Sequence, residues 1–156
     1  MTFEIFLVFL LSYISGSIPF GLLLTKFFLS KDIRKIGSKN IGATNVLRTG
    51  NKFIAGLTLL LDIFKGALPI IVINYYFPNL IYLAGLAAFL GHIFPVWLKF
   101  TGGKGVATYL GIIFALSLKL GLFFCLSWIL IAFITKYSSL SSIISTLIIF
   151  LLSFLE

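Results

Sequence analysis

The chain has 156 residues, of which 60% are hydrophobic, 17% aromatic and only 10% charged, and its mean hydropathy is +1.18. This composition leaves too little polar surface to cover a water-soluble globule, so it excludes a soluble protein and indicates one that lies in a lipid bilayer. The formal net charge is +8, with 12 Lys and Arg against 4 Asp and Glu. The cations cluster in loops beside apolar segments and not along a soluble face, so we expect no nucleic-acid partner.

The first apolar segment, residues 3–29, is long enough to cross a bilayer but is interrupted by "SGSIPFG". A crossing helix takes roughly 20 residues. A signal peptide would begin with a positively charged region, but this segment carries Glu4 there. Pro19 and Phe20 are unsuitable for a small-residue cleavage site, so we interpret the segment as a retained span. The small residues favour close helix packing, and proline opens the helical hydrogen-bond ladder. A gap that holds an acyl chain is the alternative.

Further apolar segments predict an all-α, polytopic membrane bundle of about six spans in one domain, residues 1–156. The fourth and fifth spans share one apolar stretch with a turn near Lys119, so each is shorter than a full crossing. The expected segments are residues 53–73, residues 80–98, residues 106–134 for the fourth and fifth together, and residues 140–155.

The distribution of Lys and Arg predicts the orientation of the spans. Most of these cations flank or occupy the segment between the first two spans, and short basic loops stay in the cytoplasm. The N-terminus is therefore expected outside, and three polar loops, residues 30–52, 99–105 and 135–142, are expected inside. Basic loops also bind anionic lipid head groups, which explains much of the charge without any site. Because the three loops share one side, they can converge on one site at the inner membrane surface.

The stretch "TGGKG" places Gly102, Gly103 and Gly105 around Lys104 at the start of the fourth expected helix. Glycines let consecutive backbone N–H groups face one anion, and a helix N-terminus and a lysine add positive charge. The stretch is not a Walker loop, because Gly105 stands where Ser or Thr must follow the lysine. The pattern predicts a phosphate site. A flexible turn whose lysine reaches the membrane interface is the alternative.

A second loop, "IGSKNIGATNVLRTG", gathers small polar side chains between glycines. Ser, Thr and Asn often serve only as helix caps and turn formers. Arg48 is harder to explain in that way, because its planar guanidinium suits bidentate phosphate binding. The candidate polar residues of this loop are Ser38, Asn40, Thr44, Asn45 and Arg48.

The usual catalytic constellations are missing from the sequence. It has one histidine and four carboxylates, with no GxSxG motif and no His/Cys cluster, so we expect no metal and no cofactor. His92 is expected to cap or pack at the inner end of the third span; direct catalysis is the alternative, and we include it among the candidate substrate-binding residues. Asp62 and Lys65 lie three residues apart in the second span, which predicts a buried ion pair, with a polar pocket as the alternative.

Five stretches in this order, "SGSIPFG", "IGSKNIGATNVLRTG", "LLDIFKG", "GHIFPVWLKFTGGKGVAT" and "KYSSLSSI", resemble the bacterial acyl-phosphate:glycerol-3-phosphate acyltransferase family. The resemblance extends over about residues 15–143. It implies acyl transfer from acyl phosphate to glycerol 3-phosphate, which gives lysophosphatidic acid in the first step of phospholipid biosynthesis. It also implies an inner-membrane bundle of seven spans with an outer N-terminus and a cytoplasmic active site. The seventh helix and its tail are expected to be absent, so a truncated, inactive homologue is an alternative.

The resemblance also implies roles for individual residues. Ser38 and Arg48 correspond to an essential serine and arginine of the family, and the glycine loop with Lys104 corresponds to the loop assigned to glycerol 3-phosphate. Lys39 stands where the family usually has glycine. The candidate catalytic residues are Ser38, Arg48 and Lys104, and the candidate substrate-binding residues are Asn40, Thr44, Asn45, His92, Gly102, Gly103, Gly105, Ser141 and Ser142.

The chemistry expected of such a site needs few titratable groups. Acyl phosphate is already activated, so the site has to orient two anionic substrates and neutralise their charge. We expect Arg48, Lys104 and the glycine amides to hold the two phosphates while the glycerol hydroxyl attacks the acyl carbon directly, without an acyl-enzyme. Membrane lipids are the surrounding partners. A transporter or channel for a phosphorylated solute is an alternative from a different class.

Overall fold

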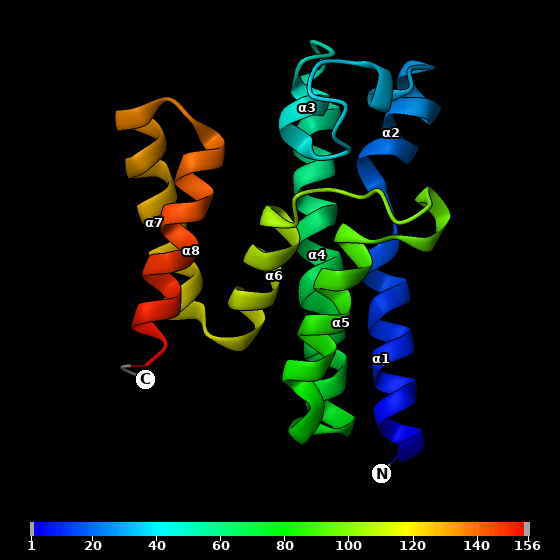
Figure 1. The fold of residues 1–156 in the computed structure, drawn as a ribbon, viewed down its shortest axis with the longest axis vertical. Coiled ribbons are helices and arrows are strands. Elements are labelled where there is room, and N and C mark those ends of the chain that lie inside the picture. Colours follow the sequence, from blue (N-terminus) through cyan, green and yellow to red (C-terminus); the bar gives the residue numbers. More distant parts are fainter. Residues whose placement is uncertain (1, 155–156) are drawn as a thin grey trace. The chain divides into compact units, whose positions relative to one another are not determined.

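The computed structural model describes residues 2–154, and the regular structure within them is entirely helical (Figure 1). This confirms the predicted all-α fold class. Three short 3-10 turns, η1 Ile33–Lys35, η2 Pro78–Leu80 and η3 Val96–Leu98, lie between the α-helices. The α-helices are α1 Thr2–Ser17, α2 Phe20–Leu29, α3 Ala43–Leu47, α4 Lys52–Tyr76, α5 Ile81–Ile93, α6 Val106–Leu116, α7 Leu118–Thr135 and α8 Ser138–Leu152.

Four helical segments within the described residues are long and apolar enough to cross a membrane: Thr2–Leu29, Lys52–Tyr76, Pro78–Leu98 and Leu118–Thr135. Helices α6 and α8 are apolar but shorter, with 11 and 15 residues. The six expected spans therefore correspond to four full-length candidates and two shorter helices.

The break between α6 and α7 lies at Ser117, which confirms the prediction of two helices with a turn near Lys119. The Ser117 hydroxyl accepts a hydrogen bond from the Leu120 backbone amide at 3.3 Å. Ser is a preferred N-cap because its side chain satisfies an amide of the first helical turn. The helix therefore starts directly after the serine, and Lys119 lies inside its first turn.

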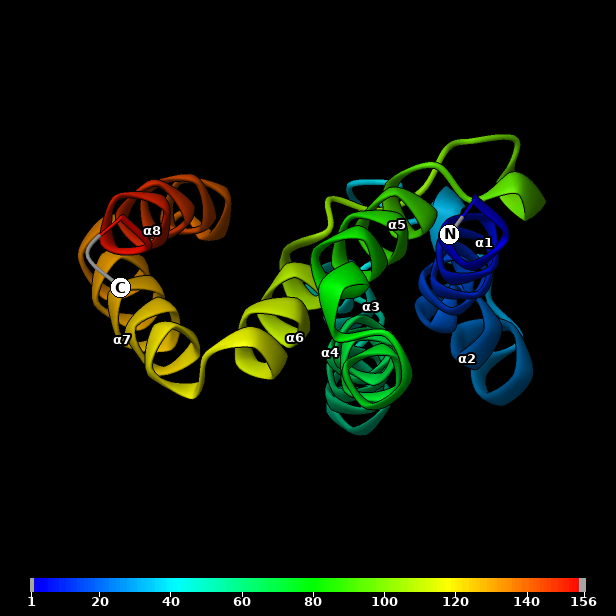
Figure 2. The same ribbon diagram turned by 90° about the horizontal axis from the view of Figure 1, so that it is seen from below.

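The chain forms two compact units, Met1–Ile112 and Ile113–Glu156. In the first unit, α1 packs on α5 and α4, and α4 packs on α5 and on the short helix α3 (Figures 1 and 2). In the second unit, α7 packs on α8. The sequence prediction of one domain over residues 1–156 stays a prediction.

Close backbone contact explains the small residues of the interrupted first span. A side chain at Gly16 would overlap the Ala88 carbonyl, and one at Gly91 would overlap the Tyr13 carbonyl, so α1 and α5 touch backbone to backbone. A side chain at Gly21 would likewise overlap the Ile41 carbonyl. The interpretation of the "SGSIPFG" stretch as a site of close helix packing is confirmed at Gly16 and Gly21.

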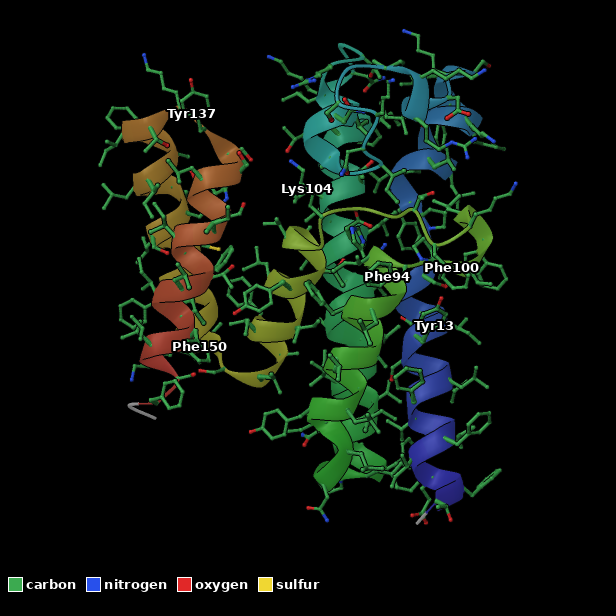
Figure 3. All side chains as sticks on the ribbon, in the orientation of Figure 1. Tyr13, Phe94, Phe100, Lys104, Tyr137 and Phe150 are labelled. Carbon is green, nitrogen blue, oxygen red and sulfur yellow. The ribbon has the colours of Figure 1, made fainter. Side chains whose placement is uncertain are left out.

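The segment that follows α5 lies beside the middle of the first span. Helix α5 ends at Ile93, two residues before Pro95, as expected because the residue before a proline rarely stays helical. The Tyr13 hydroxyl then donates to the Phe94 carbonyl at 2.6 Å (Figure 3), and the Trp97 indole N–H donates to the Ser17 hydroxyl at 2.7 Å. Tyr13 and Ser17 lie midway along Thr2–Leu29. The glycine-containing loop therefore starts at mid-span depth.

Candidate functional site

One buried side chain organises the loop that carries most of the predicted polar site residues. Asn45 is 2% exposed. Its amide nitrogen donates to three carbonyls, those of Ile33, Ile36 and Asn40, at 3.1, 3.0 and 2.8 Å. Its amide oxygen accepts from the Ser38 backbone N–H at 3.0 Å. The side chain is thus fully occupied by its own loop, so we assign Asn45 to holding the loop rather than to contacting substrate.

Arg48 lies over the turn that carries Ser38. Gly37 has a φ of +53°, a conformation that favours glycine. A Cβ built there would lie 2.7 Å from Cδ and 2.8 Å from Nη1 of Arg48. Ser38 and Arg48 are both exposed. The structure therefore brings the predicted serine and arginine together on an accessible surface.

The remaining polar residues of this loop differ in their surroundings. The Asn40 side-chain oxygen accepts from the Gly42 backbone N–H at 2.9 Å, which leaves its amide nitrogen for other contacts. Thr44 is exposed in the first turn of α3. Lys39, which stands where the resembled family usually has glycine, has a φ of +61°. The usual glycine is therefore explained by the backbone, because L-residues with a Cβ are strained in this region.

An exposed ion pair lies at the beginning of the same loop. The Asp32 carboxylate accepts from the Arg34 side chain at 2.7 and 2.9 Å and from the Arg34 backbone N–H at 3.1 Å. The Arg34 guanidinium holds the pKa of the Asp32 carboxyl well below its usual range. Asp32 thereby caps the N-terminus of η1, in the segment that follows α2.

The glycine loop, residues 99–105, is fixed by backbone contacts. The Gly102 amide donates to the Ile93 carbonyl at 2.9 Å, and the Gly103 amide donates to the His92 carbonyl at 3.1 Å. A side chain at Gly103 would overlap the His92 ring, and one at Gly102 would overlap the His92 carbonyl. These two glycines are therefore required for close approach to α5. Their amides already donate to carbonyls of α5, so in this structure they are not free to form the expected phosphate cradle.

Two other amides of the glycine loop remain for an anion. The backbone N–H groups of Lys104 and Gly105 have no acceptor within residues 2–154. They immediately precede the N-terminus of α6, which adds a partial positive charge. Gly105 has a φ of +80°, and its Cα lies against the Phe89 ring. The Lys104 side chain is exposed and extends toward the end of the first unit at which α3 lies (Figures 1 and 3).

One buried cluster joins the two loops. Leu98, which precedes the glycine loop, belongs to the same apolar cluster as Ile41 and Val46, which bracket the start of α3. Both loops are therefore anchored to one core in the first unit. Their cations, Arg48 and Lys104, are exposed beside it.

His92 lies in the last turn of α5 and is 4% exposed. Its Nδ1 is 4.0 Å from Asp62 Oδ1, and its ring packs under Gly103. The prediction that His92 packs at the end of the third span is confirmed. Its burial places it behind the loop and not on the accessible surface.

Asp62 and Lys65 form the predicted buried ion pair, with 2.8 Å between Lys65 Nζ and Asp62 Oδ1. The sequence did not predict a further contact: Lys65 Nζ donates to the Ile18 carbonyl at 2.6 Å. Pro19 follows Ile18 and breaks the first span there. Proline inside an apolar span leaves backbone carbonyls without their helical hydrogen bonds, so they need other donors. The Lys65 ammonium group is such a donor, and Pro19 was the sequence feature that could have indicated it.

Ser141 and Ser142 lie in the second unit, within the packing of α7 on α8. The Ser141 hydroxyl donates to the Tyr137 carbonyl at 2.8 Å. The Ser142 hydroxyl donates to the Ser138 carbonyl at 2.9 Å and accepts from the Trp128 indole N–H at 3.0 Å. Both serines are buried, so their contacts within this unit are those of helix packing. Their predicted part in substrate binding stays a prediction.

No group of three or more His, Cys, Asp or Glu within residues 2–154 is placed to hold a metal ion. The candidate site therefore consists of Ser38, Arg48, Lys104 and two free amides, held by Asn45 and by glycines. Taken with the apolar helices, these features define a class: a polytopic helical membrane protein whose cationic loops suit phosphorylated substrates.

Comparisons with known proteins agree with that class. The family model described as glycerol-3-phosphate acyltransferase matches residues 6–156. The chain is 58% identical over 146 residues to the glycerol-3-phosphate acyltransferase of Pelagibacter ubique (strain HTCC1062), across 94% of this chain and 76% of that protein. It is also 58% identical over 151 residues to the protein of the same name from Bartonella henselae, across 94% of this chain and 72% of that protein.

Two solved structures share the fold. Both are crystal structures of PlsY (YgiH), an integral membrane glycerol 3-phosphate acyltransferase, with 39% identity to this chain. The glycerol 3-phosphate form has a TM-score of 0.91 over 97% of this chain and 77% of that chain. The lysophosphatidic acid form has a TM-score of 0.89 over 97% of this chain and 76% of that chain. The chain belongs to the glycerol-3-phosphate acyltransferase family, which confirms the resemblance of its motifs.

Proposed function

We propose that this chain transfers a fatty acyl group from acyl phosphate to glycerol 3-phosphate, giving lysophosphatidic acid and inorganic phosphate in phospholipid synthesis. The relatives are named glycerol-3-phosphate acyltransferase, and the neighbouring structures are described as glycerol 3-phosphate and lysophosphatidic acid forms. The observation that carries the proposal is the anchoring of the Ser38–Arg48 loop and the glycine loop on one apolar cluster through Leu98.

In the proposed reaction, the two loops bind different phosphates. Lys104, with the free amides of Lys104 and Gly105 at the start of α6, binds the phosphate of glycerol 3-phosphate. Arg48, over the turn that carries Ser38, binds the phosphate of the acyl donor. Two anions that would otherwise repel each other are thereby held side by side.

The chemical step then needs no strong protein base. A glycerol hydroxyl oxygen forms a bond to the acyl carbon, and the bond between that carbon and the phosphate oxygen breaks. The hydroxyl proton passes to an oxygen of the departing phosphate. Arg48 and Lys104 offset the charge that develops. Because Ser38 is exposed whereas His92, the one histidine of the sequence, is buried, we propose direct attack without an acyl-serine.

The depth of the glycine loop suits a lipid-soluble donor. The loop starts beside the middle of the first span, where Trp97 bonds to Ser17. A fatty acyl chain that lies in the hydrocarbon region could therefore present its carbonyl carbon near the loop. We further propose that this face is cytoplasmic, in the bacterial inner membrane with the N-terminus outside, because the basic loop between α2 and α4 follows the positive-inside rule.

Turnover by the purified protein in lipid nanodiscs tests the proposal. Acyl phosphate and glycerol 3-phosphate are supplied, and release of inorganic phosphate and formation of lysophosphatidic acid are measured. We expect release that depends on the acceptor and falls by roughly 100-fold in Arg48→Ala, as for loss of a charge-stabilising group. Arg34→Ala removes the other arginine of the sequence and should change turnover by less than about twofold, because that side chain pairs with Asp32 at the surface.

The same protein reconstituted into sealed lipid vesicles separates the alternatives. Flux of glycerol 3-phosphate across vesicles without phosphate release would favour a transporter, and no activity of either kind would favour an inactive homologue. Incubation with radiolabelled acyl phosphate alone tests the chemical route. A labelled acyl-serine on the protein would exclude direct attack.

A further inference from the structure

Three ionisable side chains lie buried together in the middle of the first unit. Asp62 and Lys65 are each 2% exposed, and His92 is 4% exposed. They come from α4 and from the end of α5, and none is accessible to a substrate. The proposed reaction gives them no direct role.

One end of this cluster lies at the break in the first span. Lys65 Nζ donates to the Ile18 carbonyl at 2.6 Å and lies 5.6 Å from the centre of the Phe20 ring. The Ser15 hydroxyl donates back to the Lys65 carbonyl at 3.2 Å. Lys65, on α4, is thus bonded twice to the end of the α1 segment, through its ammonium group and through its carbonyl, and Asp62 neutralises its charge.

The other end of the cluster lies under the glycine loop. Asp62 Oδ1 lies 4.0 Å from His92 Nδ1, which is a close electrostatic contact and not a hydrogen bond, and His92 Nδ1 has no hydrogen-bond partner among the described residues. The opposite edge of the same ring, Nε2 and Cε1, occupies the place that a side chain at Gly103 would need. The His92 carbonyl accepts the Gly103 amide at 3.1 Å. An unbroken series of contacts therefore runs from Ile18 through Lys65, Asp62 and His92 to the loop.

Helix packing alone does not account for this arrangement. Burying a charge pair costs several kcal/mol per ion in desolvation, and apolar replacements of similar volume are often at least as stable. Charged side chains inside spans are retained mainly where they serve a function. Since the cluster is closed to solvent, that function has to act through the groups it contacts, and the glycine loop is the one with free amides for an anion.

We propose that Asp62, Lys65 and His92 are positioning residues that hold the glycine loop in the conformation that binds the acceptor. Asp62 orients the His92 ring, the ring supports Gly103, and Lys65 ties the assembly to the first span. This inference rests on the proposed function, in which the loop binds the phosphate of glycerol 3-phosphate. Its effect is specific to the acceptor, because Arg48 and Ser38 lie on a loop held separately by Asn45.

The test compares steady-state kinetics of the wild type and the double variant Asp62→Asn/Lys65→Met in nanodiscs. The double change removes both charges and leaves neither buried alone. We expect the KM for glycerol 3-phosphate to rise by about tenfold, because small displacements of a binding group are costly, while the KM for acyl phosphate changes by less than about twofold. Thr58→Val is the matched control: Thr58 is buried on the same helix, its hydroxyl bonds only to Ile54, and both KM values should stay unchanged.

Hydrogen–deuterium exchange of the same proteins gives a readout that does not need activity. The amides of Gly102 and Gly103, which bond to α5, should lose protection in the double variant while those of α5 itself keep it. Equal loss of protection throughout the first unit, or an equal rise of both KM values, would overturn the proposal in favour of a structural role. Unchanged loop protection with an unchanged glycerol 3-phosphate KM would also overturn it.

A milder variant covers the case in which the double variant does not fold. Asp62→Glu keeps the charge opposite Lys65 but moves the carboxylate relative to His92, so a smaller change in the same direction is expected for loop exchange and acceptor KM. If the wild type shows no turnover, the proposed function fails. The exchange experiment then still decides whether the cluster holds the loop.

Discussion

The two loops of the candidate site are held in place by opposite kinds of contact. Residues 37–48 wrap around one buried side chain, Asn45, which makes four hydrogen bonds to them and to η1. Residues 99–105 have no such side chain and are instead pressed against α5, with the Gly102 and Gly103 amides bonded to its last carbonyls. Each loop presents exposed cations, Lys39 and Arg48 in the first and Lys99 and Lys104 in the second.

This difference predicts which kind of substitution destabilises each loop. A loop held by a side chain is destabilised when atoms are removed, because its backbone loses the hydrogen bonds of that side chain. A loop held by close backbone approach is damaged when atoms are added, because there is no room for a Cβ. Deletion in the first loop and addition in the second therefore test the comparison directly.

The largest effect is expected for Asn45→Ala. It removes four hydrogen bonds and leaves the Ser38 N–H and the Asn40 carbonyl without these partners, so the free energy of unfolding should fall by about 3 kcal/mol. Turnover should be lost with it, because Ser38 is no longer fixed. Denaturant titration in mixed micelles measures the stability. Asn51→Ala, which removes a single capping bond to the Ile54 amide, should cost only about 1 kcal/mol.

The second effect is expected for Gly103→Ala. The new methyl group would overlap the His92 ring, so the loop has to move and the KM for glycerol 3-phosphate should rise by roughly 10- to 100-fold. Kinetics at saturating acyl phosphate measure it. Gly56→Ala is the control, because no atom lies within 4 Å of a Cβ there. In a helix this change should leave kinetics unchanged and add up to about 1 kcal/mol of stability. An unchanged KM in Gly103→Ala would contradict the close-approach account.

A smaller effect of opposite sign is expected for Lys39→Gly in the first loop. Lys39 has a φ of +61°, so glycine relieves backbone strain and should raise the free energy of unfolding by up to about 1 kcal/mol. Thermal unfolding followed by tryptophan fluorescence measures the change. Gly50→Ala makes the reverse change at a φ of +87°, where a Cβ meets no neighbour, and should destabilise by about 1 kcal/mol. A loss of stability in Lys39→Gly would show that the lysine side chain stabilises the loop.

The smallest effect concerns the exposed Asp32–Arg34 pair. Because the pKa of Asp32 is lowered from 3.8 in the folded protein, the carboxylate adds stability above that value and loses it as the pH falls toward the folded value. The stability advantage of the wild type over Asp32→Asn should therefore shrink between about pH 5 and pH 3. Unfolding measured across this range checks the sign. An advantage that grows toward low pH would contradict the pairing.

Much of the fold and part of the site could be predicted from local patterns. Apolar runs indicated the helices, Pro19 indicated the break in the first span, and the spacing of Asp62 and Lys65 indicated their pair. The predicted turn near Lys119 is confirmed, and the structure adds that Ser117 is the residue that caps the next helix. Asn45 was predicted to bind substrate, yet its partners are carbonyls five to twelve residues away, which spacing does not reveal.

The sequence by itself determined that this is a helical membrane protein of the glycerol-3-phosphate acyltransferase family, since hydropathy and motif order are read along the chain. Only the tertiary structure decided which groups remain available for a phosphate. The Gly102 and Gly103 amides bond to α5, whereas those of Lys104 and Gly105 have no acceptor among residues 2–154, and His92 lies behind the loop. The physical reason is that a backbone amide bonds to the nearest suitable carbonyl in space, and in the glycine loop that carbonyl lies on a neighbouring helix.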